Sequence, residues 1–187
     1  MHILYTIGHS NRKFPDFLSL LKQYKINRVI DVRTIPKSRF VPWTNEKQLE
    51  KNLEKENIEY MHFPQLGGLR TPCANSVNLG WRNKSFRGYA DYMQTDDFFI
   101  ALKELNRLLK KDRVAIMCAE AVPWRCHRSL IADAELSRGI KVIHIISDKS
   151  SQEHVLTSFA VVDDKSTPIR VIYPLENKKN PQQGDLL

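Results

Sequence analysis

Short apolar runs alternate along the chain with segments whose apolar residues recur at helical spacing. Apolar runs of strand length lie at residues 3–7, 28–32, 59–63, 113–118 and 141–146. Helical spacing predicts helices over residues 14–24, 45–56, 96–111 and 126–138, the last followed by Gly139 as a typical C-terminal signal. Residues 171–173 predict an edge strand, and residues 64–88, with four Gly and little periodicity, predict a long loop.

This alternation of strands and helices is typical of an α/β fold. We expect three layers, in which a mostly parallel sheet carries helices on both faces. The near-continuous apolar run at 113–118 favours this arrangement, because a parallel sheet is covered on both sides. The pattern predicts a single α/β domain over residues 1–174 and a flexible, polar tail over residues 175–187.

The composition adds positive charge to this picture. The 187 residues include 29 Lys and Arg against 21 Asp and Glu, which gives a formal net charge of +8. A surface of this kind attracts anions such as phosphates, nucleotides or nucleic acid, although the same charge also simply keeps a protein soluble.

The number of cysteines and the length of the apolar runs indicate in which cellular compartment the protein resides. Three cysteines, an odd number, argue against a secreted disulfide framework. No apolar run approaches the ~20 residues of a membrane span, and the first residues lack the features of a secretory signal. We therefore expect a cytoplasmic protein with reduced thiols and no membrane partner.

Reactive side chains follow the predicted strands at the points where the strands end. In open α/β sheets ligands bind outside the carboxyl ends of the strands, so we expect these side chains to share one rim. The candidate site residues are His9, Ser10, Asn11, Arg12, Asp31, Arg33, Arg39, Cys118, Glu120, Arg125, Cys126, His127 and Arg128.

The densest group of these residues lies between Cys118 and Arg128. A thiol at a strand end, followed by arginines and a helix N-terminus, is typical of a thiolate site that binds anions. Cys118 is then the candidate nucleophile or redox thiol, and Cys126 contacts the substrate. The spacing to Arg125 is Cys-x6-Arg rather than the Cys-x5-Arg of tyrosine phosphatases, so the segment does not predict a phosphatase.

The other candidates divide into catalytic and anion-binding groups. His9 and His127 are candidate acid–base groups, and Asp31 and Glu120 act as bases or orient the arginines. Asp31 interrupts an apolar strand, where a carboxylate is costly unless it is paired, so a structural ion pair is equally consistent. Contacts to the anion are assigned to Ser10, Asn11, Arg12, Arg33, Arg39, Arg125 and Arg128.

The turn after the first strand has a simpler interpretation as well. Gly8 permits a left-handed turn, and Ser10 or Asn11 is a typical cap for the helix that follows. The turn does not have the spacing of a dinucleotide or phosphate-loop motif.

Other interpretations of the same residues stay open. A basic groove with stacking platforms would suit single-stranded nucleic acid and would draw on Arg33, Lys37, Arg39, Arg70, Arg82, Arg87, Arg125 and Arg128 with Phe40, Trp43, Trp81, Phe86, Tyr89 and Trp124. Cys118, Cys126, His127 and His9 could hold a metal ion, although the chain has no Cys-x2-Cys pair. The two cysteines could also be packing residues.

Several motifs occur in a specific order along the chain. They are Thr6-Ile-Gly-His-Ser-Asn-Arg12, Asp31-Val-Arg33 with Pro36 and Ser38-Arg39, Leu66-Gly-Gly68, Gly88-Tyr-Ala-Asp-Tyr-Met93, Cys118-Ala-Glu120 and Cys126-His-Arg128. In these motifs the chain resembles the domain of unknown function 488 family over residues 1–173. The resemblance implies an α/β fold and supports the choice of site residues, but it implies no reaction. The stretch 40–45 departs from the expected pattern, which bears on substrate contacts there.

These observations lead to one expectation and two alternatives. We expect a small cytoplasmic enzyme that binds an anionic substrate, such as a phosphate-bearing nucleotide or nucleic acid, at a Cys/His/Arg/Asp site. The reaction and any cofactor stay open. The alternatives are a non-catalytic module that binds nucleic acid and a Cys/His metal site.

Overall fold

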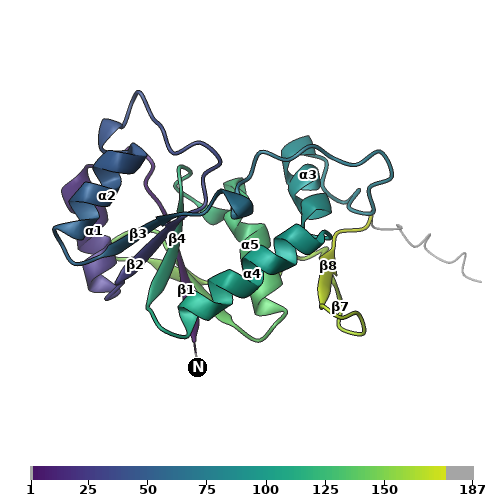
Figure 1. The fold of residues 1–187 in the computed structure, drawn as a ribbon. Coiled ribbons are helices and arrows are strands. Elements are labelled where there is room, and N and C mark those ends of the chain that lie inside the picture. The colour runs from purple at the N-terminus through teal and green to yellow at the C-terminus, as the bar shows by residue number, and fades with distance from the viewer. Residues whose placement is uncertain (1, 176–187) are drawn as a thin grey trace, which may run out of the picture.

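The computed structural model describes residues 2–175, so all but the first residue of the expected tail lies outside the described residues (Figure 1). In chain order the strands (β), α-helices (α) and short 3-10 helices (η) are β1 (Ile3–Gly8), α1 (Phe14–Gln23), β2 (Arg28–Asp31), η1 (Pro42–Thr44), α2 (Glu46–Glu54), β3 (Glu59–His62), η2 (Pro64–Leu66), α3 (Lys84–Tyr92), α4 (Asp96–Leu109), β4 (Val114–Cys118), η3 (Pro123–Arg125), α5 (Arg128–Leu136), β5 (Lys141–Ile145), β6 (Ser151–Glu153), β7 (Val161–Asp163) and β8 (Arg170–Ile172).

The main sheet has the strand order β3-β2-β4-β1-β5-β6. The pairs among β1 to β5 are all parallel, and β6 adds to β5 in the antiparallel direction. This arrangement confirms the expected three-layer α/β fold with a mostly parallel sheet. Because the parallel strands run in one direction, the residues that follow β1, β2 and β4 emerge at the same edge of the sheet.

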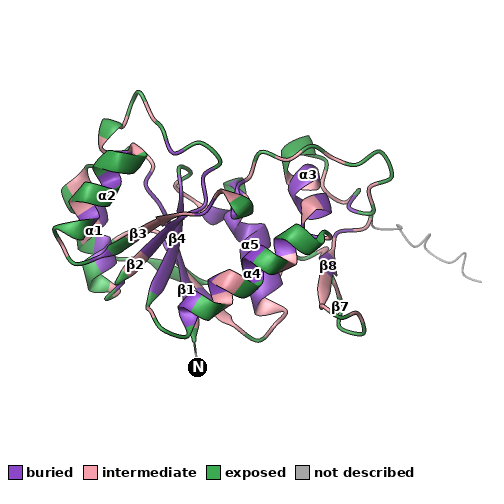
Figure 2. Ribbon diagram, in the orientation of Figure 1, coloured by how far each residue is buried: buried purple, intermediate pink, exposed green. Residues whose placement is uncertain are grey.

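Apolar side chains alternate between the two faces of the sheet. Each face has its own helices (Figures 1 and 2). Helices α1 and α2 pack Phe17, Leu21 and Leu49 against one face, on which Tyr5 of β1 lies. Helices α3, α4 and α5 cover the other face, on which the neighbouring Leu4 lies. The central strands are therefore buried on both sides, as the continuous apolar run of β4 predicted.

Helix α3 lies partly within the segment expected to be a loop. The Asn83 side chain caps the helix, because it accepts hydrogen bonds from the backbone N–H of Ser85 and Phe86 at 2.8 and 3.4 Å. Gly88 lies inside the helix rather than in a turn. A Cβ at Gly88 would lie 2.3 Å from the carbonyl oxygen of Arg70, so glycine is required there for close packing.

The last expected strand lies outside the main sheet. Strand β8 pairs with β7 in an antiparallel, two-stranded sheet of its own, and β6 takes the edge of the main sheet next to β5. The apolar pattern of residues 171–173 was sufficient to indicate a strand, but it carries no information on the strand's partner. Among residues 2–175, no helix is long and apolar enough to cross a membrane.

One carboxyl group, that of Glu135, is buried and forms no ion pair among residues 2–175. Glu135 of α5 is fully buried, and neither of its carboxyl oxygens has a hydrogen-bond partner among the described residues. The side-chain oxygen of Asn106 in α4 is buried and unpaired as well. Burial raises the pKa of Glu135 from 4.5 to about 8, so the neutral acid is the stable form at neutral pH.

Replacement of Glu135 should reveal the cost of this buried acid. The folded protein keeps its proton up to about pH 8, whereas the unfolded chain releases it near pH 4.5. The acid's contribution to the free energy of unfolding is thus complete below pH 4.5 and is lost by about 1.4 kcal/mol per unit as the pH rises to 8. Glu135→Gln should remove this loss and be more stable than wild type at pH 8 by about 2–5 kcal/mol in urea unfolding.

The control is Glu104→Gln on α4, at an ion-paired surface carboxylate. The pKa of Glu104 is lowered by its hydrogen bond to Arg107, so this variant should leave the slope between pH 5 and 8 unchanged. Equal slopes in wild type and Glu135→Gln would contradict the assignment.

Candidate functional site

A pocket of about 490 Å³ opens at the edge where β1, β2 and β4 end. Its walls come from the ends of these strands, the loop between β2 and α2, the loop after η2, the start of α3 and the segment that leads into α5. The lining residues are His9, Arg33, Thr34, Ile35, Lys37, Ser38, Gly68, Leu69, Ser85, Phe86, Cys118, Ala119, Glu120, Arg125, Cys126 and His127. The structure thus brings together seven of the candidate residues, which are His9, Arg33, Cys118, Glu120, Arg125, Cys126 and His127.

Close backbone packing joins the ends of β1 and β4. The N–H of His9 donates to the carbonyl oxygen of Cys118 at 3.0 Å, and that of Ser10 donates to the oxygen of Ala119 at 2.9 Å. A Cβ at Gly8 would lie 1.7 Å from the carbonyl oxygen of Glu120. Gly8 is therefore needed for close approach and not for a left-handed turn, and the expectation of a positive φ was wrong. The left-handed residue is Ser10, with φ of 49°.

Two thiols lie side by side on the floor of the pocket. Cys118 is the last residue of β4, and Cys126 follows η3 and precedes α5. Their sulfur atoms are 3.2 Å apart, which places the two Sγ atoms in direct contact. The backbone N–H of Glu120 donates to Cys118 Sγ at 3.3 Å. The two cysteines therefore form one contacting pair, and both also belong to the apolar core.

The guanidinium of Arg128 lies directly beneath this pair of thiols. Its Nε donates to Cys118 Sγ at 2.9 Å and to Cys126 Sγ at 3.2 Å. Its Nη2 donates to the carbonyl oxygen of Glu120 at 2.6 Å, and its Nη1 donates to Thr6 Oγ1 at 3.2 Å. The side chain is fully buried, and it forms no ion pair with a carboxylate among residues 2–175.

A buried cation of this kind favours an anion next to it. A hydrogen bond from the Cys118 thiol and the charge of Arg128 lower the pKa of Cys126 to about 6, against the opposing effect of burial. Burial and the hydrogen bond with Cys126 raise the pKa of Cys118. The pair therefore loses one proton below neutral pH and keeps the other, and the negative charge on Cys126 lies in contact with Arg128 and with the Cys118 thiol.

Behind Arg128, a chain of hydrogen bonds runs deeper into the protein. Thr6 Oγ1 bonds to His144 Nδ1 at 2.7 Å, His144 Nε2 bonds to His154 Nδ1 at 2.9 Å, and His154 Nε2 bonds to Asp133 Oδ1 at 2.8 Å. Arginine can only donate, so Thr6 Oγ1 accepts from Arg128 at one end of the chain. A carboxylate can only accept, so His154 Nε2 donates to Asp133 at the other end.

This chain of hydrogen bonds was not predicted from the sequence. The available signal was His144 in the middle of an apolar strand, which is the same signal that identified Asp31. Burial and the neighbouring His154 lower the pKa of His144 to about 3, so this ring is neutral at pH 7.

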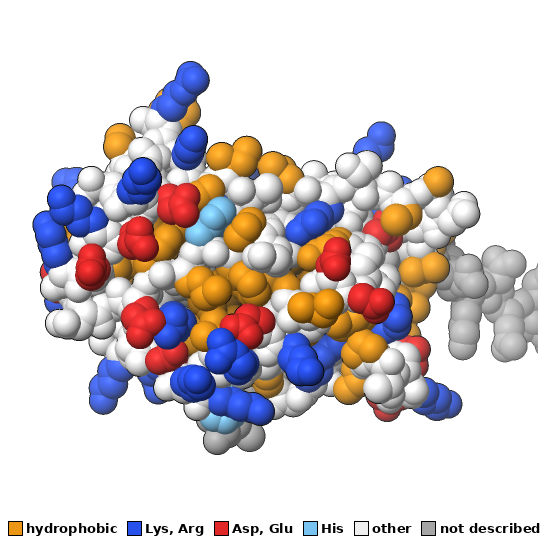
Figure 3. Space-filling view, viewed as in Figure 1, with side chains coloured by type: hydrophobic (Ala, Val, Ile, Leu, Met, Phe, Trp, Pro, Cys, Tyr) orange, Lys and Arg blue, Asp and Glu red, His pale blue; other side chains and the backbone are white. Residues whose placement is uncertain are grey.

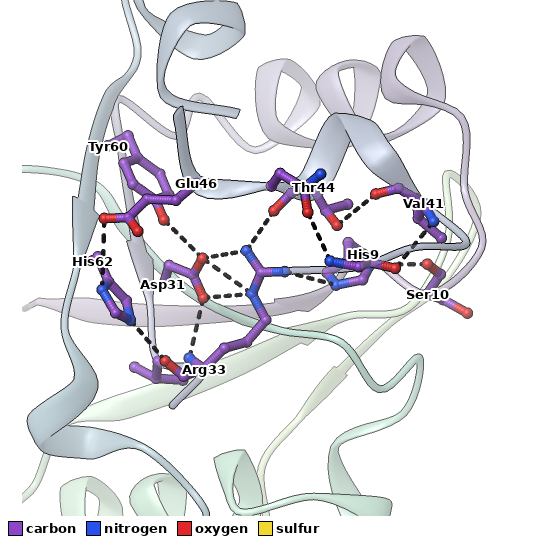
Figure 4. A network of polar contacts seen from close by, with 12 residues as sticks. His9, Ser10, Asp31, Arg33, Val41, Thr44, Glu46, Tyr60 and His62 are labelled. Atoms are coloured by element: carbon purple, nitrogen blue, oxygen red, sulfur yellow. Dashed lines mark hydrogen bonds and ion pairs between the residues drawn. The ribbon is translucent and has the colours of Figure 1, made fainter. Parts of the chain in front are cut away.

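Asp31 and Arg33 form a buried ion pair at one side of the pocket (Figure 4). Arg33 Nε donates to Asp31 Oδ1 at 2.8 Å, and the Tyr60 hydroxyl donates to Oδ2 at 2.8 Å. Arg33 also donates to the carbonyl oxygen of Thr44 at 2.7 Å and faces His9 Nε2 at 3.4 Å. Asp31 is fully buried and does not line the pocket, so its place in the structure is that of a partner that positions Arg33.

The two histidines of the pocket are both neutral at pH 7. His9 donates from Nδ1 to the carbonyl oxygen of Ser10 at 2.8 Å, and His127 donates from Nε2 to that of Val32 at 3.0 Å. Burial lowers the pKa of each to about 4. The unprotonated nitrogens, His9 Nε2 and His127 Nδ1, accept hydrogen bonds or protons and have no proton to give. A Cβ at Gly68 would lie 2.4 Å from His127 Nδ1, so this glycine makes room for the ring.

Several candidates lie away from the pocket. Arg12 donates to the carbonyl oxygens of Gly8 and Ile146 and joins the ends of β1 and β5. Ser10 and Asn11 do not line the pocket, and they do not cap α1, whose N-cap is Lys13 without a side-chain bond. Arg39 is exposed on the loop between β2 and α2, and Arg128 lies beneath the pocket floor.

The broad basic groove suggested by the sequence is only partly present. Arg70 donates to the carbonyl oxygen of Gly67 and stacks on the Tyr92 ring, and Arg87 donates to that of Trp81. Trp43 packs on Phe14 and Phe17, and Tyr89 is fully buried. Of the residues proposed for the groove, Arg33, Lys37, Arg125 and Phe86 line the pocket. Across residues 2–175, no cluster of three or more His, Cys, Asp or Glu side chains has the geometry to hold a metal ion.

The family comparison agrees with the sequence motifs. The model described as Domain of unknown function DUF488 matches residues 13–135. This range includes the Asp31–Arg33 pair and the segment from Cys118 to Arg128. No curated protein and no solved structure gives a match to the chain.

The ionisation of the thiol pair gives a direct test of this geometry. Alkylation of Cys126 by iodoacetamide, followed by peptide mass spectrometry, should rise with a midpoint near pH 6, against about 8.5 for an ordinary thiol. Arg128→Gln removes the buried cation and should raise the midpoint, because burial is then opposed mainly by the hydrogen bond from Cys118. Arg128→Lys keeps the charge and should give an intermediate midpoint. A midpoint that stays near 6 in a folded Arg128→Gln protein would exclude Arg128 as the cause.

Proposed function

The chain belongs to the DUF488 family, and on that premise we propose that it is a thiol-dependent enzyme for an anionic, phosphate-bearing substrate bound at the carboxyl ends of the strands. The observation that carries this proposal is the pair of thiols in contact with a buried guanidinium on the floor of an open pocket. Its reduced cysteines suit a reducing compartment such as the cytoplasm.

The charges around the pocket favour an anion. Arg33, Lys37 and Arg125 line it, against Glu120 as the lining carboxylate. The buried Asp31 offsets the charge of Arg33, and the thiolate offsets that of Arg128. Lys37 and Arg125 against Glu120 then leave one positive charge in excess, within a chain whose net charge is +8. Such a field attracts an anionic substrate, and it weakens as salt is added.

Within this pocket we assign the nucleophile to Cys126. Its pKa is the lowered one of the pair, and its 7% exposure is greater than the 3% of Cys118. Cys118 keeps its proton and donates a hydrogen bond to the thiolate. The sequence alone had favoured Cys118, because it ends the strand. His9 Nε2 and His127 Nδ1 supply acceptors for substrate protons, and Arg125 and Lys37 contact the anion.

A pair of reagents tests both halves of this proposal. Iodoacetate is anionic and iodoacetamide is neutral, and both alkylate the same thiolate. The ratio of their rates at one cysteine cancels the degree of ionisation and leaves the preference for an anion. We expect the ratio to be about three- to fivefold higher at Cys126 than at the exposed Cys73 of the same molecule, since one nearby charge contributes roughly 1 kcal/mol. Inorganic phosphate should slow both reactions at Cys126.

Arg125→Ala should lower the ratio at Cys126 about threefold, and Arg107→Ala on the surface of α4 should not change it. Equal ratios at Cys126 and Cys73 would rule out an anion-selective pocket.

A second candidate function is binding of single-stranded nucleic acid, and it rests on one loop. Phe40, on the loop between β2 and α2, is 96% exposed and has Arg39 and Lys37 as near neighbours in the chain. Lys or Arg side chains project from this loop, which stands out from the body of the molecule (Figure 3). An exposed aromatic ring beside cations is typical of a stacking platform for a base.

Phe40→Ala tests this second function. The variant should weaken binding of a short single-stranded DNA about tenfold in fluorescence anisotropy, because one stacked base contributes roughly 1–3 kcal/mol. Leu175→Ala, at another exposed apolar residue, serves as the control. Binding should also fall steeply between 50 and 200 mM salt. Absence of binding to DNA and RNA at low salt would remove this function and leave the enzyme proposal untouched.

A further inference from the structure

The distance between the two pocket thiols matters for redox chemistry as well as for acidity. The sulfurs of Cys118 and Cys126 are 3.2 Å apart, and a disulfide bond is about 2.05 Å long, so they need to approach by about 1.2 Å. The segment between them includes the exposed residues Glu120, Trp124 and Arg125. Cys126 lies outside regular secondary structure, between η3 and α5, so a small shift there does not break the sheet.

We propose that the Cys118–Cys126 pair is a redox-active dithiol that reduces a hydroperoxide and closes to a disulfide. The proposal rests on the same pocket as the proposed function, but it assigns a second activity to it. The Sγ–Sγ contact at the floor of an open pocket carries it, because the nucleophile and the thiol that resolves its oxidised form are already adjacent.

The reaction has two steps. The Cys126 thiolate attacks the terminal oxygen of a hydroperoxide, ROOH. An S–O bond forms, the O–O bond breaks, and the released alkoxide takes a proton from water to give ROH. The Cys118 thiol then attacks the sulfur of the Cys126 sulfenic acid. An S–S bond forms, the S–O bond breaks, and hydroxide leaves with the thiol proton as water. The dithiol loses two electrons and the peroxide gains them.

The surroundings of the pair favour a return to the reduced state. Closure of the disulfide removes the negative charge that faces Arg128, and the guanidinium stays buried beneath it without a carboxylate partner in the described part of the chain. An uncompensated buried cation destabilises the oxidised form relative to the dithiol. Two molecules of a small thiol should therefore reduce the disulfide readily and be oxidised to their own disulfide.

The position of the two cysteines in the pocket also supports the redox assignment. Both sulfurs belong to residues that line the pocket, so a small peroxide reaches them from solvent. Cys73 is exposed and does not line the pocket, and so provides an internal comparison for a solvent-accessible thiol.

The experiment uses the full chain carrying Cys73→Ser, and hydrogen peroxide as the probe. The reduced protein is mixed with one equivalent of peroxide and followed by intact mass and peptide mapping. We expect a loss of two hydrogens and a Cys118–Cys126 cross-linked peptide, both reversed by millimolar glutathione. Peroxide should disappear at least tenfold faster than with free cysteine at pH 7. Gain of oxygen atoms without the cross-link, or a rate no greater than that of free cysteine, would overturn the proposal.

Single substitutions separate the two roles. Cys118→Ser should leave Cys126 as a sulfenic acid that dimedone traps, whereas Cys126→Ser should lower the rate of peroxide consumption at least tenfold. Circular dichroism checks that each variant is folded. If the disulfide forms but Cys126 shows no preference for iodoacetate, the anionic-substrate function fails and this inference stands. If Cys126 prefers iodoacetate but no disulfide forms, this inference fails and the anionic-substrate function stands.

Discussion

The buried charge of Arg128 is the constraint on which the site depends. Removal of a guanidinium from water is costly unless nearby groups compensate its charge and satisfy its donors. Here two sulfurs, a hydroxyl and a carbonyl oxygen accept its hydrogen bonds. Of these four acceptors, only the thiol pair can take a negative charge. The lowered pKa of Cys126 and the burial of Arg128 therefore both depend on this contact.

The same arginine connects the pocket to a buried chain of hydrogen bonds on the face of the sheet that α5 covers. Through Thr6, His144 and His154 its hydrogen bonds end on Asp133, which is fully buried and also accepts from the hydroxyls of Thr157 and Tyr173. A proton cannot pass along this chain from the pocket, because Arg128 keeps its protons and its pKa is raised by the thiols despite burial. The chain instead fixes the orientation of the guanidinium. The segment after β5, which supplies His154, Thr157 and Tyr173, lies beyond residues 13–135 and yet supports the site through Asp133.

The parts of this picture that follow from the sequence are those fixed by periodicity and strand direction. Parallel strands bring their carboxyl ends to one edge, so the meeting of His9, Arg33, Cys118 and Cys126 could be predicted without coordinates. The direction in which a long side chain points could not be predicted in this way. Arg12 and Arg128 leave the same edge, but both reach back to protein carbonyls and sulfurs, because buried acceptors there need donors. The requirement for glycine at position 8 could not be predicted either. It comes from a close contact with Glu120, which is more than 100 residues away in the chain.

The sequence pattern also did not predict α3 or the three short helices that begin with Pro. Each of the short helices η1, η2 and η3 begins with Pro, which fixes φ near the helical value but indicates a single turn as readily as a helix start. Asn83 belongs to a residue type that often caps helices, but Gly88 disfavours the helix that it begins. That glycine is explained by the carbonyl oxygen of Arg70, a tertiary contact that overrides the poor helix propensity of the residue.

The lowered pKa of Cys126 affects its roles as a nucleophile and as a leaving group differently. A shift from about 8.5 to about 6 raises the ionised fraction at pH 7 from about 3% to about 90%, roughly a 30-fold gain. The intrinsic nucleophilicity of a thiolate falls with its pKa, however, with a Brønsted slope of about 0.4–0.5, which removes roughly tenfold of that gain. Acidity alone thus improves attack on a substrate only a few-fold. Under the proposed function, any larger rate advantage has to come from a pocket that holds and orients the anion next to the sulfur. The low pKa has a greater effect where Cys126 is the leaving group, because a stabilised thiolate departs faster when a small thiol attacks Cys118 in the disulfide. The contact with Arg128 therefore favours reopening of the disulfide more strongly than it favours attack by the thiolate.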